Sequence, residues 1–262
     1  ALYDRPVPCG RDANSVGLHS LPRNFINIGG ILYFSANNGT NGFEVWKSDG
    51  TSTGTVMVRD IRSGTGSANP SSLTNVNGTL FFLANDGTNG YELWKSNGTS
   101  AGTVMVRNIR SGSASSDADQ FVNVAGTLFF RANDGVNGYE LWKSDGTAAG
   151  TIMVRNIRAG SSDGNPQKLT AVNGTLFFTA NDASNGYELW TSNGTSAGTV
   201  MVTRAARSRS PTRNAPKPTA RAAIAAASGA VVPASTIASL PTFAIVPSVA
   251  AVSAIAGGVS NS

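Results

Sequence analysis

The sequence of 262 residues is long enough to bury the core of one large domain or two small ones. Charged residues make up 13% of it, about half the usual share of a globular chain, and 30 glycines favour turns over helices. The single cysteine, Cys9, excludes an intramolecular disulfide framework, and the single histidine, His19, excludes a zinc site built from several imidazoles. We therefore do not expect an ordinary soluble α/β enzyme.

The net charge of +5 is concentrated near the end of the chain. All fifteen acidic residues and fourteen of the twenty basic ones precede residue 204, which gives this part a net charge of −1. The other six basic residues follow residue 203 and account for the pI near 9.7. Most of the chain therefore has no electrostatic reason to bind nucleic acid or another polyanion.

Four tandem copies of a 48-residue repeat make up most of the chain. All four tryptophans recur at this spacing, and so do all four methionines. They are Trp46, Trp94, Trp142 and Trp190, and Met57, Met105, Met153 and Met201. A constant period of this length is typical of a solenoid, a propeller or another array of small units.

Each copy predicts four short strands joined by tight turns. In the second copy the strands are Leu73–Val76, Thr79–Ala84, Tyr91–Ser96 and Thr103–Ile109. Asn77-Gly78 suits a type I′ hairpin turn, and β-branched and aromatic residues without helical spacing fill the runs. The continuous apolar runs LFFLA and TVMV indicate strands that are covered on both faces.

These features predict an all-β fold, a β-propeller-like array of four 48-residue, four-stranded antiparallel repeats. A closed four-blade ring and a fragment of a larger propeller both agree with four copies. A β-solenoid fits less well, because its coils are usually shorter and its strands are parallel.

The repeat resembles a known bacterial family. In the third copy, Glu140-Leu141-Trp142 precedes Asp145-Gly146-Thr147 by two residues, which is similar to the ELWxxDGT repeat, also labelled hyalin-like. The first copy has Val45 in place of leucine, and the second and fourth have Asn97 and Asn193 in place of the aspartate. Asp or Asn before Gly-Thr suits a tight turn. The resemblance covers residues 22–202 and implies large, secreted or surface-exposed bacterial proteins of propeller-like build, without an assigned reaction.

The recurring tryptophans have two interpretations. They can pack blade against blade, since a large aromatic side chain in a middle strand dominates burial. Alternatively, their indole faces contact a sugar or another flat ligand, which makes Trp46, Trp94, Trp142 and Trp190 the candidate ligand-binding residues. Packing is favoured, because ligand-binding residues seldom recur unchanged in every unit.

The turn before the third strand carries the candidate metal ligands. Its oxygen-bearing side chains and glycine bend suit calcium, although no copy has the spacing of an EF-hand. The candidate ligands are Asp86, Asn89 and Glu92, then Asp134, Asn137 and Glu140, and then Asp182, Asn185 and Glu188. The first copy has Asn38 in place of the acid, and a polar loop without metal is the favoured interpretation.

No catalytic residue is predicted. A glycosidase needs two carboxylates a fixed distance apart at one place, whereas the most conspicuous acids here recur with the repeat. Within residues 22–202, no acid, arginine or histidine outside the repeat pattern stands out as a unique catalytic group. We therefore predict that the chain is not an enzyme.

The two ends differ from the repeats, which occupy residues 22–203. Residues 1–21 are interpreted as a lead-in segment, and no signal peptide can be read before Ala1. Residues 204–262 form a low-complexity tail that is first basic and then rich in Ala, Ser, Val and Pro. The tail is interpreted as frameshift-derived or as a disordered natural segment. A membrane anchor and a wall-sorting signal are disfavoured by three prolines in the apolar part and by LPTFA in place of LPxTG.

The sequence thus predicts a non-enzymatic, secreted or cell-surface repeat scaffold that mediates binding or adhesion, with a glycan or a surface protein as its ligand. Two alternatives are a fragment of a sialidase- or lyase-like propeller enzyme, whose catalytic residues lie outside this chain, and a purely structural spacer. Neither nucleic acid nor a membrane span is expected, and calcium is the one candidate cofactor. An open array would leave apolar faces exposed and self-associate.

Overall fold

The computed structural model describes residues 20–202. All of these residues belong to one compact unit. Cys9, His19, most of the lead-in segment and the predicted tail at 204–262 lie outside the described residues. Among the described residues, no helix is long and apolar enough to span a bilayer.

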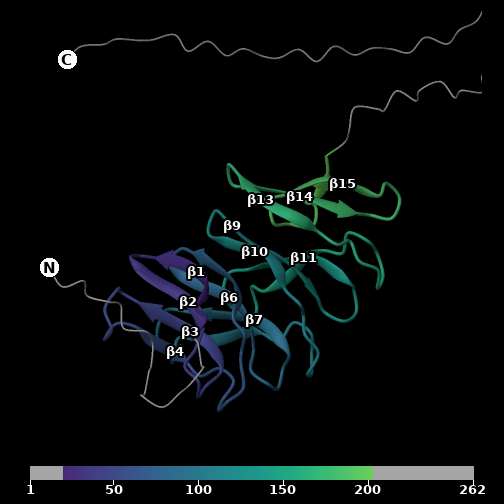
Figure 1. The fold of residues 1–262 in the computed structure, drawn as a ribbon. Coiled ribbons are helices and arrows are strands. Elements are labelled where there is room, and N and C mark those ends of the chain that lie inside the picture. Colours follow the sequence, from purple (N-terminus) through teal and green to yellow (C-terminus); the bar gives the residue numbers. More distant parts are fainter. Residues whose placement is uncertain (1–19, 203–262) are drawn as a thin grey trace, which may run out of the picture. The chain divides into compact units, whose positions relative to one another are not determined.

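Residues 20–202 form four antiparallel sheets of four strands each, which we call blades 1 to 4 (Figure 1). Blade 1 contains β1 (Arg23–Ile28), β2 (Ile31–Asn37), β3 (Phe43–Ser48) and β4 (Val56–Arg59). Blade 2 contains β5 (Ser71–Val76), β6 (Thr79–Asn85), β7 (Tyr91–Ser96) and β8 (Val104–Arg107). Blade 3 contains β9 (Asp119–Val124), β10 (Thr127–Asn133), β11 (Tyr139–Ser144) and β12 (Ile152–Arg155). Blade 4 contains β13 (Gln167–Val172), β14 (Thr175–Asn181), β15 (Tyr187–Ser192) and β16 (Val200–Met201).

The strands of each blade pair in chain order, as the turn residues predict. Asn77 and Gly78 both have positive φ angles, 50° and 84°, as a type I′ turn between β5 and β6 requires. The predicted first strand of this copy begins two residues too late, and the predicted fourth strand is too long at both ends. The predicted all-β fold of four repeated, four-stranded antiparallel sheets is confirmed.

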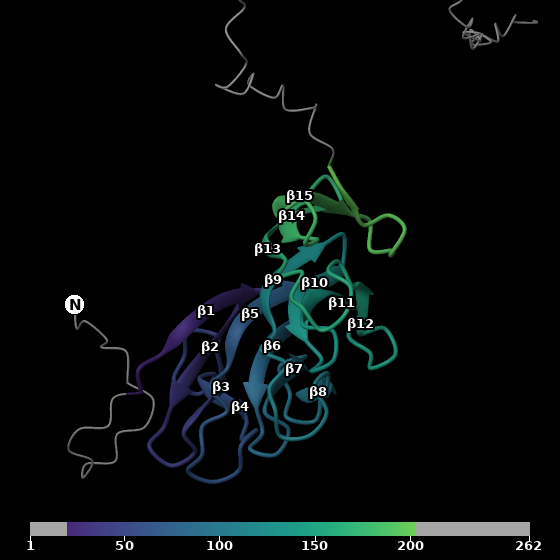
Figure 2. The same ribbon diagram turned by 90° about the vertical axis from the view of Figure 1, so that its right-hand side faces the viewer.

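Successive blades pack face to face, and their first strands β1, β5, β9 and β13 lie side by side (Figure 2). The face that each blade turns toward the following blade is called its trailing face, and the opposite one its leading face. Between blades 1 and 2, Val45 and Val58 of the trailing face pack against Phe82 and Trp94 of the leading face. Because side chains alternate along a strand, both faces must be apolar, which explains the continuous apolar runs.

A lysine and an arginine from the trailing face of each of blades 1 to 3 cross to the next blade. Lys95 donates from Nζ to the carbonyl of Gly146 at 2.8 Å, and Arg107 donates to the carbonyl of Thr151 at 2.6 Å. The same bonds join the other neighbouring blades. Blade 4 has Thr191 where the other three carry the lysine.

The trailing face of blade 4 is exposed in the described structure. Leu189 is 46% exposed, whereas its counterpart Leu141 in blade 3 is fully buried. Val172 and Val202 are exposed to 45% and 39%, whereas their counterparts in blades 2 and 3 are buried. The apolar pattern of an internal interface is therefore present on a face that no described blade covers.

Leu141→Ala and Leu189→Ala form a matched pair that measures how well each trailing face is covered. We expect Leu141→Ala to lower the free energy of unfolding by about 2–5 kcal/mol, because it opens a cavity between blades 3 and 4. Leu189→Ala should lower it by less than about 1 kcal/mol. Urea denaturation measures both. An equal loss would show that the face of blade 4 is covered in solution.

Candidate functional site

The repeated glutamate anchors the segment that crosses from one blade to the next. Glu92 is fully buried; its Oε2 accepts the N–H of Ile109 at 2.9 Å, and its Oε1 accepts those of Arg110 and Ser116 at 3.3 and 3.1 Å. The counterparts in blades 1 and 3, Glu44 and Glu140, make the same three bonds. Burial raises the pKa of each of these carboxyls to about 7, against the opposing effect of the backbone donors.

The predicted calcium loop is held by a chain of hydrogen bonds. In blade 2, Asp86 Oδ1 accepts the N–H groups of Thr88 and Asn89, both at 2.8 Å, and Asp86 Oδ2 accepts the amide of Asn89 at 2.7 Å. Asn89 Oδ1 in turn accepts the amide of Asn108 at 2.8 Å. Asp134, Asn137 and Asn156 form the same chain in blade 3.

Blade 1 contains the same chain with its direction reversed. Asn38 donates to Asn41 at 2.9 Å, and Asn41 donates to Asp60 at 2.8 Å. The single acid of blade 1 therefore lies at the opposite end of the hydrogen-bonded chain. The side-chain amide of the middle asparagine, Asn41, has the opposite orientation to that of Asn89. Each chain in these three blades contains one acid and two amides, which explains why the first copy can have asparagine in place of Asp86.

These contacts do not fit the predicted calcium site. The oxygens of Asp86 serve the turn, whereas those of Glu92 accept donors from the crossing segment, so the two carboxylates have separate partners. The same division holds for Asp134 and Glu140, and Asp182 likewise accepts donors from its own turn. Across residues 20–202 no group of three or more acidic, His or Cys side chains is arranged to hold a metal ion.

The predicted ligand-binding tryptophans are buried. Trp46, Trp94, Trp142 and Trp190 are only 4–8% exposed. The last three lie in the clusters that join neighbouring blades, and Trp46 packs with Phe34, Ala36 and Met57 of its own blade. Their ring faces are therefore not open to a ligand, which corrects that prediction and leaves packing as their role.

The Asn-Gly-Thr turn of the motif is also structural. Asn97 Oδ1 accepts the N–H of Thr99 at 3.0 Å and its hydroxyl at 2.7 Å. Gly98 has a φ of 84°, and a Cβ there would lie 2.3 Å from the hydroxyl of Tyr33 in blade 1. The predicted turn role of this segment is confirmed.

The copies differ where each first strand begins. Cross-strand pairs between the first and second strands of blades 1 to 4 are Arg23 with Ser35, Ser71 with Leu83, Asp119 with Arg131 and Gln167 with Thr179. Each first strand has a register shift directly after this pair, which marks a bulge. Bulges re-aim side chains and are frequent next to functional sites.

Left-handed backbone conformations recur beside these pairs. Two non-glycine residues per blade, one before and one directly after the variable position, have positive φ: Leu21 and Asn24, Asn69 and Ser72, Asp117 and Gln120, and Asn165 and Lys168. Such conformations cost free energy and persist only where the surrounding structure holds them. Strain of this kind directs attention to the ends of the first strands as a functional region.

An open hollow of about 610 Å³ lies at these strand ends in blades 1 to 3. Its lining residues come from three neighbouring blades: Arg23, Asn24, Asn69, Pro70, Ser71, Ser72, Leu83, Tyr91, Asp117, Ala118 and Asp119. The guanidinium of Arg23 lies 4.1 Å from the centre of the Phe43 ring and donates to Asn69 at 3.3 Å. Asn69 donates to the hydroxyl of Tyr91 at 3.2 Å.

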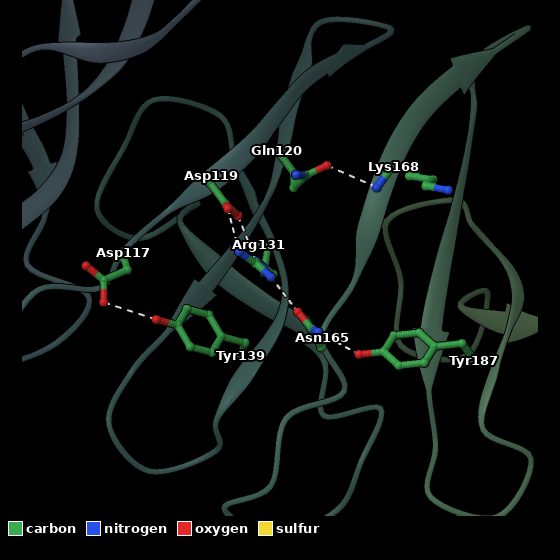
Figure 3. A network of polar contacts seen from close by, with 8 residues as sticks. All are labelled: Asp117, Asp119, Gln120, Arg131, Tyr139, Asn165, Lys168 and Tyr187. Atoms are coloured by element: carbon green, nitrogen blue, oxygen red, sulfur yellow. Dashed lines mark hydrogen bonds and ion pairs between the residues drawn. The ribbon is translucent and has the colours of Figure 1, made fainter.

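Blade 3 has a polar network at the corresponding position (Figure 3). Arg131 stands where blade 2 has Leu83; its Nε and Nη2 bond to Asp119 at 2.7 and 2.5 Å, and its Nη1 bonds to Asn165 of the segment leading into blade 4. Figure 3 shows Arg131 between these two partners. This is the only ion pair found among residues 20–202.

Leu83 and Arg131 occupy equivalent positions in blades 2 and 3 but differ in their relation to the hollow. A shorter apolar side chain, Leu83, lines it, whereas Arg131 extends from blade 3 to the segment before blade 4. Arg131 and Asp119 fall outside the repeat pattern and were missed when no unique group in residues 22–202 was recognised. The sequence does contain a signal for these two residues, because the four otherwise similar copies carry side chains of different charge at the same repeat positions.

Comparisons with known proteins place the chain near β-propeller structures only distantly. No family model matches the chain, and no curated protein matches it. A puromycin hydrolase is 12% identical with a TM-score of 0.46 over 66% of this chain, and the match spans only 27% of the hydrolase.

Two further solved structures are similarly remote. An endo-arabinase from Bacteroides thetaiotaomicron is 14% identical with a TM-score of 0.33, covering 76% of this chain and 83% of its own. An α-L-arabinofuranosidase from Clostridium thermocellum is 16% identical with a TM-score of 0.31, covering 68% and 70%. At these levels the likenesses say nothing about the ligand or activity of this chain.

The buried glutamates predict an unusual pH dependence. Because their folded-state pKa of about 7 exceeds the ordinary value of 4.5, their contribution to stability is complete below pH 4.5 and is lost as the pH rises through 7. The aspartates of the turns, whose pKa hydrogen bonding lowers, contribute in the opposite sense at lower pH. The free energy of unfolding should therefore fall between pH 5 and 8.

Glu92→Gln should reduce that fall by about a third, since it removes one of three equivalent groups. Urea denaturation across this pH range measures the slope, which separates titration from any constant loss of stability. An unchanged slope would mean that Glu92 keeps its charge in the folded state.

The two directions of the hydrogen-bonded chain in blades 1 and 2 define a double-mutant cycle. Asn108→Asp alone puts an acid at both ends and should lower the free energy of unfolding by about 1–3 kcal/mol, because one acceptor loses its donor. Adding Asp86→Asn recreates the order found in blade 1 and should recover most of that loss. Thermal and urea unfolding of the single and double variants check this, and additive effects would contradict it.

Proposed function

We propose that this chain is a non-enzymatic binding scaffold of propeller-like build and that the hollow across blades 1 to 3 is its ligand site. The observation that carries the proposal is the contrast between constant and variable positions. The constant Trp, Glu and Asn/Asp-Gly-Thr residues are committed to packing, crossing segments and turns. The variable positions at the ends of the first strands line the hollow.

The hollow is an open depression that exposes both polar and apolar groups. Its volume of about 610 Å³ equals that of many ligand pockets, about 300–1,000 Å³, but it is much less enclosed than they are. It combines a guanidinium, two carboxylates, amides and hydroxyls with apolar surface. Arg23, Ser71 and Asp119 begin strands β1, β5 and β9, whereas Asn69 and Asp117 lie two residues before β5 and β9.

The contacts of the two acids in the hollow argue against a catalytic pair within these blades. The enzyme alternative, which places its catalytic residues outside this chain, is a separate case. Both oxygens of Asp119 are bonded to Arg131, and Asp117 accepts the hydroxyl of Tyr139 at 3.0 Å. A carboxylate bound in this bidentate way serves poorly as a general acid or base, which must exchange a proton with the substrate. Asp119 is therefore assigned to holding Arg131, and Asp117, which accepts one hydrogen bond, is assigned to recognition.

The wider assignments rest on the repeated motif. The ELWxxDGT-like segments motivate membership of that bacterial family and a secreted or cell-surface location, where the scaffold would contribute to adhesion through a glycan or surface protein. Detection of the chain at the surface of intact source cells by antibody labelling would support this location.

A graft between blades tests the ligand site directly. Ser71→Asp with Leu83→Arg copies the Asp119–Arg131 pair into blade 2. Asn165, which accepts a hydrogen bond from Arg131, corresponds to Asp117 one repeat earlier, so the new arginine would also have an acceptor. This double variant should fold and fill the hollow, so its binding should fall at least about tenfold. Gln167→Asp with Thr179→Arg makes the same change in blade 4, away from the hollow, and should leave binding unchanged.

A printed glycan array and an array of surface-protein peptides provide the readout. The proposal expects wild-type signals that the blade 2 graft removes and the blade 4 graft retains. Signals that survive the blade 2 graft, or the lack of any signal on either array, would overturn the hollow as the ligand site.

A further inference from the structure

We infer that the hollow selects an uncharged, polyhydroxylated ligand, a segment of a neutral saccharide chain, over an ionic one. This inference rests on the proposed function, because it concerns the ligand of the same site. It follows from the balance of charge in the hollow, from the distribution of its polar and apolar surface and from its open form.

The charged groups in and beside the hollow balance one another. Arg23, Asp117 and Asp119 line the hollow, and Arg131, which is not a lining residue, pairs with Asp119. Together these four groups carry two positive and two negative charges. Asp119 is neutralised directly by Arg131, at 2.5 Å between the Nη2 and Oδ2 atoms. A ligand with a net charge of either sign would gain no net Coulomb attraction from these four groups.

Hydrogen-bonding capacity remains available around the hollow. Among the described residues, Asp117 Oδ1 accepts no hydrogen bond, because Tyr139 binds only Oδ2. Arg23 makes one long bond of 3.3 Å and keeps other donors for a ligand. Adjacent hydroxyls of a sugar can both donate and accept, so a single ring can satisfy a carboxylate and a guanidinium without bearing charge itself.

The accessible apolar lining is deeper than the polar lining. Leu83 and Tyr91 are half-buried, whereas Arg23, Asn24 and Asp117 are exposed. A sugar ring has the complementary arrangement, with C–H groups on its faces and hydroxyls around its edge. Ring faces can therefore lie against Leu83 and Tyr91 while hydroxyls reach the exposed polar groups.

The hollow spans the ends of three neighbouring blades and is open to solvent along its length. A fully enclosed pocket would suit a small free molecule, whereas an open one of this volume admits part of a longer chain. An extended oligosaccharide can lie across it, with one or two rings in contact and the remainder in water.

Isothermal titration of the full chain with two sets of defined probes tests the inference. One set contains neutral gluco-, galacto- and arabino-oligosaccharides of two to six residues, and the other contains uronic-acid oligosaccharides and short acidic and basic peptides. We expect binding by at least one neutral series, with a Kd that changes less than about twofold between about 0.05 and 0.5 M NaCl, because no net charge is recognised.

The outcomes separate the inference from the proposal beneath it. Neutral binding that the Ser71→Asp/Leu83→Arg graft reduces at least about tenfold, and that the Gln167→Asp/Thr179→Arg control retains, supports both. Salt-sensitive binding of a charged probe that the graft abolishes would overturn the neutral-saccharide inference and leave the hollow as the ligand site. Binding that the graft does not affect, or no binding by either set, would overturn both.

Discussion

The packing of one apolar blade face on the next is the interaction on which the rest of the structure depends. No blade can bury both of its faces alone, so each needs a neighbour on either side. The tryptophan and phenylalanine of one leading face fill the space against the leucine and valines of the preceding trailing face. These residues recur unchanged or nearly so, because every internal interface presents the same volume to fill. Lysine and arginine side chains that cross to backbone carbonyls then fix the register between neighbours.

The crossing segments impose a second constraint, which is electrostatic. A segment that leaves the fourth strand of one blade and enters the first strand of the next has backbone N–H groups that a strand ladder does not satisfy. One buried glutamate accepts three of them in each of the first three blades. Connecting the blades in this way costs free energy, because burial of the glutamate carboxylate opposes its charged form.

Sequence reasoning could predict the fold because packing and turn chemistry repeat. The tryptophan spacing gave the unit, and Asn77-Gly78 gave the hairpin. It failed at residues whose role depends on contacts distant in the chain. Asp86 and Glu92 are six residues apart and look like ligands of one ion, yet their partners lie in different segments. Asp60 compensates for Asn38 across the blade, a relation that only the paired strands reveal.

The candidate site was missed for a related reason. Repetition draws attention to constant residues, and in a repeat those are the residues that every unit needs in order to fold. A ligand is met at one place, so the residues that recognise it have no reason to recur. Ser71 and Leu83 in blade 2 and Asp119 and Arg131 in blade 3 occupy equivalent backbone positions, and their side chains differ in size and charge. In this chain the constant residues account for the scaffold, and the departures from the repeat line the hollow that we propose as the ligand site.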